Sequence, residues 1–431
     1  MTYAEATVYL QSLGQFGMVL GLERIQQLSQ LAGNPDQDLK FIHVAGTNGK
    51  GSTCAFLESI FRTAGFRTAL YTSPHLVSFT ERIQINRQNI SEEQVIAGVL
   101  RLKPLAESLG SNNQPTFFEF VTLMALCHFA DQKPDIVIWE TGLGGRLDAT
   151  NIVTPLLSVI TNIQLDHENW LGKTLPKIAF EKAGIIKPQI PVLIGPVSED
   201  VHQVIEEVAK INEAPLNVCQ PERLESQVWF RELRLPLIGR FNLQNALAVL
   251  GVLLMHGISL QSAVGALAAV SPVPGRMERV DAVAGPLVIV DYAHTPDALE
   301  QALRALRQHC RGRLWCVFGC GGDRDRSKRP LMGRLAREHA DEIVVTSDNP
   351  RSESPQSIIS EICAGIPDPG VIREADRRAA IFRAVRDAGP LDCVLIAGKG
   401  HENYQETQGV RTPFSDVLTA REALAARGGE A

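Results

Sequence analysis

The sequence lacks a block of basic residues. Its 42 Lys and Arg are spread over 431 residues and are outnumbered by 48 Asp and Glu, which gives a formal net charge of -6. Proteins that follow a nucleic-acid backbone gather Lys and Arg into runs or onto one face. The charge pattern therefore disfavours a nucleic-acid partner.

Long apolar runs are also missing. No stretch approaches the ~18 consecutive apolar residues that span a bilayer, and the start, MTYAEATVYL, lacks the basic segment and apolar run of a secretory signal. The 8 cysteines are scattered, several of them in apolar segments, as is typical of reduced, buried thiols. The closest pair, Cys316 and Cys320, has no second Cys or His pair nearby, which disfavours a zinc site. We expect a cytoplasmic protein without a membrane partner.

Short apolar runs rich in Val and Ile alternate with segments of helical period, as in FIHVAG followed by STCAFLESIFRTAG. This alternation predicts an α/β fold in which helices cover parallel sheets. The segment SPVPGRMER interrupts the pattern, which then restarts with PLVIVDYAH. We expect two domains, residues 1–273 and a smaller Rossmann-like α/β domain over residues 274–431.

The run GTNGKGST, residues 46–53, follows an apolar strand and opens a helix. In such a loop, glycines let backbone N–H groups turn toward phosphates, Lys50 can reach the β- and γ-phosphates, and a hydroxyl follows for Mg²⁺. The usual pattern has a longer loop and places Ser or Thr directly after Lys, whereas Gly51 here precedes Ser52. A glycine-rich turn without a ligand is the alternative. The strand-loop-helix context favours a P-loop domain that binds ATP and Mg²⁺.

Two polar residues lie where further strands are expected to end. Glu140 closes the apolar run DIVIWE, and His167 follows LLSVITNI in the run QLDH. The carboxyl ends of parallel strands meet at one edge of a sheet, where a nucleotide-bound cation would need oxygen ligands. A lone histidine is more often a hydrogen-bonded structural residue, and Asp166 beside it could equally cap a helix. Glu140 is the stronger metal candidate of the two.

Five motifs of the first domain resemble the folylpolyglutamate and dihydrofolate synthases of the Mur ligase superfamily. They are GTNGKGST, YTSPHLVSFTERI (71–83), TFFEF (116–120), ETGLGGRLDATN (140–151) and FEKAGIIKP (180–188), and the resemblance covers most of residues 14–275. It implies that the ATP-binding residues are Thr47, Asn48, Gly49, Lys50, Gly51, Ser52, Asn245, Arg276 and Asp291. It implies that the pterin acid is held by Gly21, Arg24, Thr116, Phe117, Glu119 and Arg146.

The same resemblance implies a set of metal ligands. Ser73, Glu140 and His167 would hold Mg²⁺, and a carbamylated Lys182 would bind a second metal ion through its new carboxylate. The residues alone do not indicate this modification, because Lys182 reads as an ordinary lysine on a helix surface.

The second domain resembles a different branch, the C-terminal domain of the murein ligase that adds diaminopimelate to a UDP-MurNAc-dipeptide. The match runs from about Pro274 to the end of the chain, through DYAHTPDAL, FGCGGDRDRSKRPLMG, TSDNPRSE and AGKGHENYQ. A zwitterionic amino acid needs a guanidinium for its carboxylate and an acidic group for its ammonium. Without the resemblance, Arg351 would read as a surface arginine after a turn-forming Asn-Pro. The implied amino-acid-binding residues are Arg324, Asp348, Asn349, Arg351, Gly398 and Glu402.

Both families imply one mechanism. The γ-phosphoryl group of ATP passes to a substrate carboxylate while Lys50 and Mg²⁺ neutralise its charge, and an amine then displaces phosphate from the acyl phosphate. His294 lies on the second domain and would meet the phosphates only when the domains close. Lys50, His294 and Lys182 are the expected catalytic residues.

We expect a monomer whose partners are a small-molecule acid, folate or dihydropteroate, and L-glutamate. The folate-type acid is favoured because the chain begins a short distance before the phosphate loop, whereas the murein enzyme needs a separate domain for its UDP-sugar. One alternative is a murein-type ligase that adds meso-diaminopimelate. The other is an inactive nucleotide-binding module, which the joint presence of Lys50, Glu140, His167 and His294 disfavours.

Overall fold

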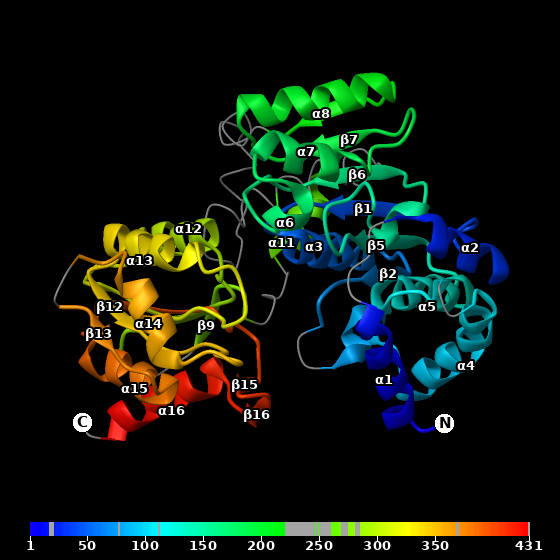
Figure 1. Cartoon of the computed structure of the whole chain (residues 1–431). Coiled ribbons are helices and arrows are strands. Elements are labelled where there is room, and N and C mark those ends of the chain that lie inside the picture. The colour runs from blue at the N-terminus through cyan, green and yellow to red at the C-terminus, as the bar shows by residue number, and fades with distance from the viewer. Residues whose placement is uncertain are drawn as a thin grey trace. The chain divides into compact units, whose positions relative to one another are not determined.

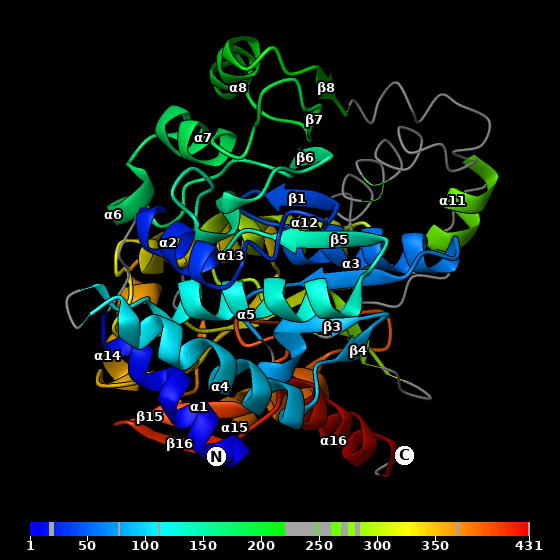
Figure 2. The same cartoon turned by 90° about the vertical axis from the view of Figure 1, so that its right-hand side faces the viewer.

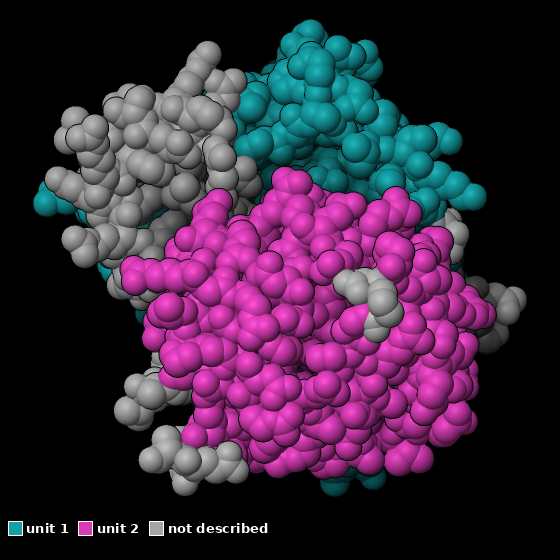
Figure 3. Space-filling view, turned by 90° about the vertical axis from the view of Figure 1, so that its left-hand side faces the viewer, with its two compact units in different colours: residues 1–235, 242–270 teal, residues 236–241, 271–431 magenta. Residues whose placement is uncertain are grey.

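The computed structural model describes residues 1–16, 21–75, 78–110, 113–219, 246, 249, 260–268, 275–280, 285–367 and 370–429. The chain divides into two compact units. Unit 1 comprises Met1–Leu235 and Asn242–Val270, and unit 2 comprises Pro236–Phe241 and Ser271–Ala431 (Figure 3). Each unit has its own sheet and its own core.

Unit 1 is built on an eight-stranded sheet in the order β4-β3-β2-β5-β1-β6-β7-β8. The ladders from β2 to β8 are parallel, whereas β3 and β4 pair antiparallel at one edge. The central strands β1 and β5 are buried along their whole length, which explains their unbroken apolar runs. The strands are β1 (Phe41–Ala45), β2 (Thr68–Tyr71), β3 (Ile83–Ile85), β4 (Gln88–Asn89), β5 (Ile136–Glu140), β6 (Leu157–Ile160), β7 (Val192–Ile194) and β8 (Leu216–Val218).

Helices surround this sheet (Figures 1 and 2). α1, α4 and α5 share a core with Phe41, Tyr71 and Trp139 of the central strands, and α7 and α8 share another with β6 and β7. The described helices are α1 (Tyr3–Ser12), η1 (Leu13–Phe16), α2 (Glu23–Leu31), α3 (Lys50–Thr63), η2 (Phe79–Arg82), α4 (Glu92–Ser108), α5 (Phe117–Gln132), η4 (Ala149–Ile152), α6 (Glu168–Leu171), α7 (Leu175–Ala183), α8 (Glu199–Ile211) and α11 (Leu260–Ala268).

Unit 2 has a six-stranded sheet in the order β13-β12-β11-β14-β10-β9, parallel except for β9, and a separate hairpin, β15-β16. α12, α13 and α14 pack on one face of the sheet, and α15 and α16 pack on the other. The elements are β9 (Glu278–Val280), β10 (Leu287–Asp291), α12 (Pro296–Arg307), β11 (Leu314–Phe318), α13 (Lys328–His339), β12 (Glu342–Val345), α14 (Pro355–Cys363), β13 (Ile372–Arg373), α15 (Arg377–Asp387), β14 (Cys393–Ala397), β15 (Tyr404–Thr407), β16 (Val410–Pro413) and α16 (Asp416–Gly429).

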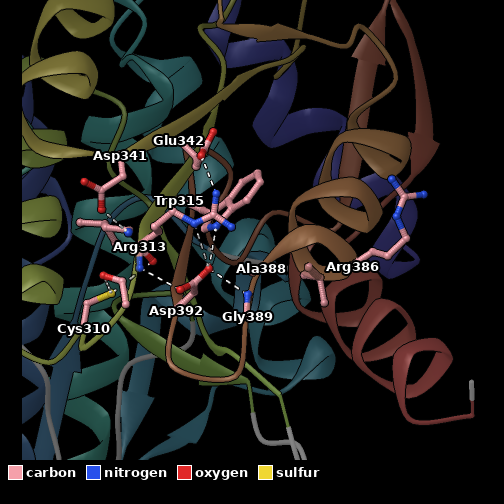
Figure 4. A network of polar contacts seen from close by, with 12 residues as sticks. Cys310, Arg313, Trp315, Asp341, Glu342, Arg386, Ala388, Gly389 and Asp392 are labelled. Carbon is pink, nitrogen blue, oxygen red and sulfur yellow. Dashed lines mark hydrogen bonds and ion pairs between the residues drawn. The ribbon is translucent and has the colours of Figure 1, made fainter. Parts of the chain in front are cut away.

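A polar network closes the amino-terminal edge of the second sheet (Figure 4). Asp392, just before β14, accepts hydrogen bonds from the backbone N–H groups of Arg313 and Gly389, both at 2.8 Å, and from Trp315 Nε1 at 3.3 Å. Arg313 also pairs with Glu342 at 2.8 Å. The network ties the starts of β11, β12 and β14 together, so their carboxyl ends present their loops side by side at the opposite edge.

The predicted α/β fold, a P-loop parallel-sheet domain followed by a smaller Rossmann-like unit, is confirmed. In the described part of the chain, no helix has the length and apolar character needed to cross a bilayer.

Candidate functional sites at the carboxyl edges of the two sheets

The phosphate loop connects β1 to α3 and depends on its glycines. Gly46 and Gly49 have φ values of 149° and 81°, which L side chains rarely adopt. A Cβ on Gly46 would lie 1.9 Å from the hydroxyl oxygen of Thr161, and one on Gly51 would lie 3.7 Å from Glu140 Oε1. The loop thus passes close to β6 and to the end of β5, while Ser52 lies in the first turn of α3.

The segment after β6 fixes the loop. The backbone N–H groups of Thr47 and Asn48 donate to the carbonyl and side-chain oxygens of Asn162, at 3.0 and 2.8 Å. Lys50 Nζ donates to the carbonyls of Gly46 and Thr47, at 3.0 and 3.2 Å. The Lys50 ammonium therefore lies inside the loop and is bonded to neutral acceptors.

Glu140 and Ser73 meet at the carboxyl end of the sheet. The Glu140 side chain is buried, and its Oε2 accepts from the Ser73 backbone N–H at 3.0 Å. His167 caps the start of α6 with a φ of 50°, and its Nε2 lies 3.6 Å from Asp166 Oδ2. Ser73 and His167 line one cavity. The described residues contain no group of three or more His, Cys, Asp or Glu suited to a metal, so a cation here would also need hydroxyl or ligand oxygens.

Lys182 is not the surface lysine that its sequence context indicates. Its side chain is only 4% exposed, and its Nζ donates to the Gly46 carbonyl at 2.7 Å. Burial, together with the nearby charge of Lys50, lowers the pKa of Lys182 to about 7. The interpretation as a solvated lysine is wrong, because α7 packs this face of the helix against the phosphate loop.

A cavity of about 420 Å³ opens beside these residues in unit 1. Glu119 is buried at its wall and accepts from the Thr116 backbone N–H at 2.7 Å and from Arg24 Nε at 3.2 Å. Arg146 pairs with Glu181 at 2.8 Å and is not among the lining residues. The cavity brings together six of the predicted residues: Gly21, Ser73, Thr116, Phe117, Glu119 and His167.

Two residues near this cavity were missed by the sequence analysis. Arg82 lines the cavity, with its guanidinium carbon 5.3 Å from the centre of the Phe117 ring, and its Nε donates to His75 Nδ1 at 2.7 Å. Burial, and secondarily the charge of Arg82, lowers the pKa of His75 to about 4. Both residues belong to the motif YTSPHLVSFTERI, but nothing in their spacing shows that they are in contact or that Arg82 lines the cavity.

In unit 2, the predicted residues Asn349 and Glu402 and the neighbouring Lys399 are all hydrogen-bonded to one another. Lys399 is fully buried, and its Nζ donates to Asn349 Oδ1 at 3.0 Å and to Glu402 Oε2 at 2.8 Å. Asn349 Nδ2 donates to the same Glu402 oxygen at 2.7 Å, and Asn349 Oδ1 also accepts from the Glu406 backbone N–H at 3.0 Å. These bonds fix the orientation of the Asn349 amide. Lys399 was not singled out from the sequence, since a fully buried lysine is rare.

The other predicted amino-acid-binding residues lie on loops after neighbouring strands. A Cβ on Gly321, after β11, would lie 2.9 Å from Arg351 Nη1 and 3.6 Å from Arg324 Cγ. A Cβ on Gly398, after β14, would lie 2.5 Å from Asp348 Oδ2. Since β11 lies between β12 and β14, the fold gathers all six predicted residues at one edge of this sheet.

The predicted nucleotide residues of unit 2 lie at the adjoining end of β10. Asp291 is buried, and burial raises its pKa despite the nearby Arg276 charge. The Arg276 guanidinium lies 4.7 Å from the centre of the Tyr292 ring, and the His294 ring lies 4.7 Å from the same ring. Asn245 lies outside the described residues.

Unit 1 carries a glycine-rich loop of the kind that binds phosphates, and unit 2 carries guanidinium and carboxylate groups at one sheet edge. Both features are typical of an ATP-dependent ligase that joins an acid to an amino acid. The chain belongs to the Mur ligase family: the Mur ligase middle domain matches residues 44–253, and the Mur ligase, glutamate ligase domain matches residues 275–400.

Several curated relatives are UDP-N-acetylmuramoyl-L-alanyl-D-glutamate–2,6-diaminopimelate ligases. The enzyme of Coxiella burnetii is 55% identical over 439 residues, covering 98% of this chain and 87% of its own length. That of Neisseria meningitidis serogroup A is 52% identical over 429 residues, covering 93% and 80%. That of Chromobacterium violaceum is 36% identical over 430 residues, also covering 93% and 80%.

Similar solved structures carry a different name. The bifunctional folylpolyglutamate synthase/dihydrofolate synthase of Yersinia pestis is 32% identical with a TM-score of 0.78, covering 99% of this chain and 98% of its own. The folylpolyglutamate synthase of Thermotoga maritima is 30% identical with a TM-score of 0.74, covering 92% and 94%.

The expectation of a folate-glutamylating enzyme is wrong, because curated relatives that match almost the whole chain at up to 55% identity are diaminopimelate ligases. The motifs behind that expectation contribute the loop after β1 and part of the wall of the unit 1 cavity. These motifs did not identify the acid substrate. The position of the phosphate loop near the start of the sequence did not identify the acid either.

Proposed function

We propose that this protein joins a 2,6-diaminopimelate-type amino acid to the carboxylate of a UDP-N-acetylmuramoyl dipeptide at the expense of ATP. The proposal rests on the names of the curated relatives and on one observation above all. Arg324 and Arg351 lie next to each other, on the same sheet edge as the Glu402 carboxylate. Two guanidinium groups and a carboxylate suit an amino acid with two zwitterionic heads.

The hydrogen bonds leave suitable groups for such a ligand. Glu402 Oε2 is taken by Lys399 and Asn349, and within the described residues Oε1 has no partner, so it can accept from an ammonium group. Arg351 Nη1 donates to the Gly322 carbonyl at 2.7 Å, while its Nε and Nη2 have no partner among those residues. Arg351 would bind a carboxylate of the amino acid with these nitrogens, and Arg324 would assist it.

The phosphate side of unit 1 fits ATP and Mg²⁺. Glycines at positive φ turn the loop, and Lys50 supplies a cation. Ser73, Glu140 and His167 would hold the metal ion, because Glu140 contacts Ser73, and Ser73 and His167 line one cavity. When bound, the ion would offset the negative charge of the phosphates. Lys50 would stabilise the γ-phosphoryl group during its transfer to the acid carboxylate, after which the amine displaces phosphate.

Lys182 fits the proposed carbamylation. Only a neutral amine attacks carbon dioxide, and a pKa of about 7 makes that form abundant near neutral pH. The new carboxylate would stand beside the Gly46 carbonyl, where it could ligate a second cation. Arg276, Asp291 and His294, together at the end of β10, remain the proposed nucleotide contacts of unit 2.

The test is ADP release with mass analysis of the product. The acid is UDP-N-acetylmuramoyl-L-alanyl-D-glutamate, offered with meso-diaminopimelate, L-lysine or L-glutamate, and dihydropteroate with L-glutamate serves as the reference pair. We expect an amide product with diaminopimelate and much slower turnover with lysine, which lacks the second carboxylate. The Lys50→Ala variant controls for contaminating ATPases. Equal use of lysine, or product from the reference pair alone, would overturn the assignment.

A further inference from the structure

Arg82 differs from the other buried arginines that the structure describes. Arg329 and Arg377, both almost completely buried, pair with carboxylates: Arg329 with Glu353 and Glu361, and Arg377 with Asp416. Arg82 is 7% exposed, yet among the described residues it has no carboxylate within ion-pairing distance. Its guanidinium therefore has no ion-pair partner in the described part of the chain.

The one side-chain hydrogen bond between Arg82 and a described residue does not change this. Because its Nε donates to His75 Nδ1 at 2.7 Å, that nitrogen must be unprotonated, so His75 is a neutral acceptor. The terminal nitrogens, Nη1 and Nη2, make no hydrogen bond to any described residue, and the residue lines the cavity of unit 1. The Phe117 ring, 5.3 Å away, flanks the guanidinium. His75 and Phe117 thus hold the group in place and leave its paired donors for a ligand.

A desolvated guanidinium without a counter-ion is costly, and its parallel N–H groups match a carboxylate. The acid of the curated relatives ends in a D-glutamate residue whose amine is used in a peptide bond. Such a residue carries two carboxylates, of which one is extended by the new amide and the other stays ionised.

We propose that Arg82 binds this second, unreacted carboxylate of the acid substrate. The inference rests on the proposed function, which it makes more specific: the acid must be a dicarboxylate at its reacting end. Ser73 and His167 line the same cavity, so the carboxylate to be activated would face the proposed metal edge while its neighbour is held by Arg82. Binding both groups fixes which of the two reacts.

The test compares two acids, UDP-N-acetylmuramoyl-L-alanyl-D-glutamate and its analogue in which the unreacted carboxylate is a carboxamide. In Arg82→Gln, we expect the KM for the natural acid to rise on the order of 30-fold or more, as for loss of one partner of a buried charge pair. The KM for the carboxamide should be the same in wild type and Arg82→Gln, and the KM values for ATP and diaminopimelate should not change. Arg82→Lys should recover part of the affinity for the natural acid. Arg101→Gln, at an exposed arginine that pairs with Asp131, is the matched control.

A binding measurement separates this inference from the proposed function. Glutarate, a simple dicarboxylate, is titrated into wild type, Arg82→Gln and Arg101→Gln and followed by saturation-transfer NMR, with circular dichroism to verify folding. We expect a glutarate signal in wild type and Arg101→Gln that disappears in Arg82→Gln. If wild type forms product but Arg82→Gln has an unchanged KM for the acid, the Arg82 assignment fails alone. If wild type forms no product but the glutarate signal depends on Arg82, the subsite stands and the proposed function fails.

Discussion

Three cations near the candidate site of unit 1 and two buried cations of unit 2 have different kinds of partners. In unit 1, Lys50 and Lys182 bond to backbone carbonyls and Arg82 bonds to a neutral histidine. In unit 2, Lys399 bonds to Glu402, and the buried Arg377 bonds to Asp416. These three cations of unit 1 therefore have no carboxylate in ion-pair contact among the described residues, whereas the two cations of unit 2 do.

This difference indicates which kind of charge each unit is suited to bind. Nucleotide phosphates and acids are anions, and uncompensated cations can bind them without first breaking an ion pair. An amino acid is a zwitterion, and it needs donors and acceptors held at fixed positions more than it needs net charge. The ion pairs of unit 2 supply that rigidity. The predictions below test this contrast.

Removal of Lys50 should have the largest effect. We expect Lys50→Ala to lower kcat by ~100-fold or more while the protein stays folded, because the lysine acts on phosphoryl charge and belongs to no apolar core. Steady-state ADP release measures the loss. Lys210→Ala, at an exposed lysine of α8, should behave like wild type. Turnover within a few-fold of wild type in Lys50→Ala would mean that the loop does not use its cation.

Lys182 tests whether an uncompensated cation of unit 1 is converted to an anion. Its pKa of about 7 lies below that of an ordinary lysine, so the reactive neutral amine gains population as the pH rises through 7. Activity of bicarbonate-depleted wild type should then return on addition of bicarbonate, and faster above pH 7 than below it. Lys182→Ala should stay inactive at any bicarbonate concentration. Mass spectrometry of an active sample that shows only the bare amine would contradict carbamylation.

Arg351 tests the ligand side of unit 2. Arg351→Ala should raise the KM for diaminopimelate by a factor that corresponds to ~2–5 kcal/mol, with the KM values for ATP and the acid nearly unchanged. Arg383→Ala, at a half-exposed arginine of α15, is the control. An unchanged KM for the amino acid would show that the Asn-Pro-Arg segment does not bind it.

The smallest effect is expected at the amino-terminal edge, away from both sites. Asp392→Asn should lower the free energy of unfolding by ~1–2 kcal/mol, through weaker bonds to Arg313 and Gly389, with no change in KM. Burial raises the pKa of Asp392, but these hydrogen bonds lower it more, so its pKa is depressed overall. The stabilisation should be complete above the ordinary Asp pKa of ~3.9 and lost as the pH falls below it. Urea unfolding of both proteins at two pH values measures this.

The sequence predicts best the positions of residues that follow strands or lie in glycine-rich loops. Glu140 and His167 follow apolar runs, and glycine spacing marks the phosphate loop, so the order of elements alone places these residues at one edge. The roles of these residues remain predictions. The order of elements does not predict the role proposed for Arg82, because that role depends on the lack of an ion-pair partner among the described residues.

Burial of charge is the other feature that local sequence hides. Lys182 follows Glu181 on a short amphipathic helix and looks solvated, and only packing against the loop after β1 shows otherwise. Lys399 and Asn349 are distant in sequence and meet because β14 and β12 flank β11. The substrate was misjudged for a different reason: the motifs of unit 1 resemble the folate branch, whereas curated relatives that match almost the whole chain are diaminopimelate ligases.

The pair between Arg377 and Asp416 links α16 to the proposed amino-acid site. Arg377 also donates to the carbonyls of Ser347 and Ala397, which precede the loops that carry Asp348 and Gly398. During synthesis on a ribosome, Arg377 emerges before Asp416, the carboxylate that it pairs with among the described residues and the first residue of α16. The proposed amino-acid site of unit 2 therefore cannot be completed until α16 has been synthesised, and a variant truncated before α16 would lack the partner that fixes Arg377.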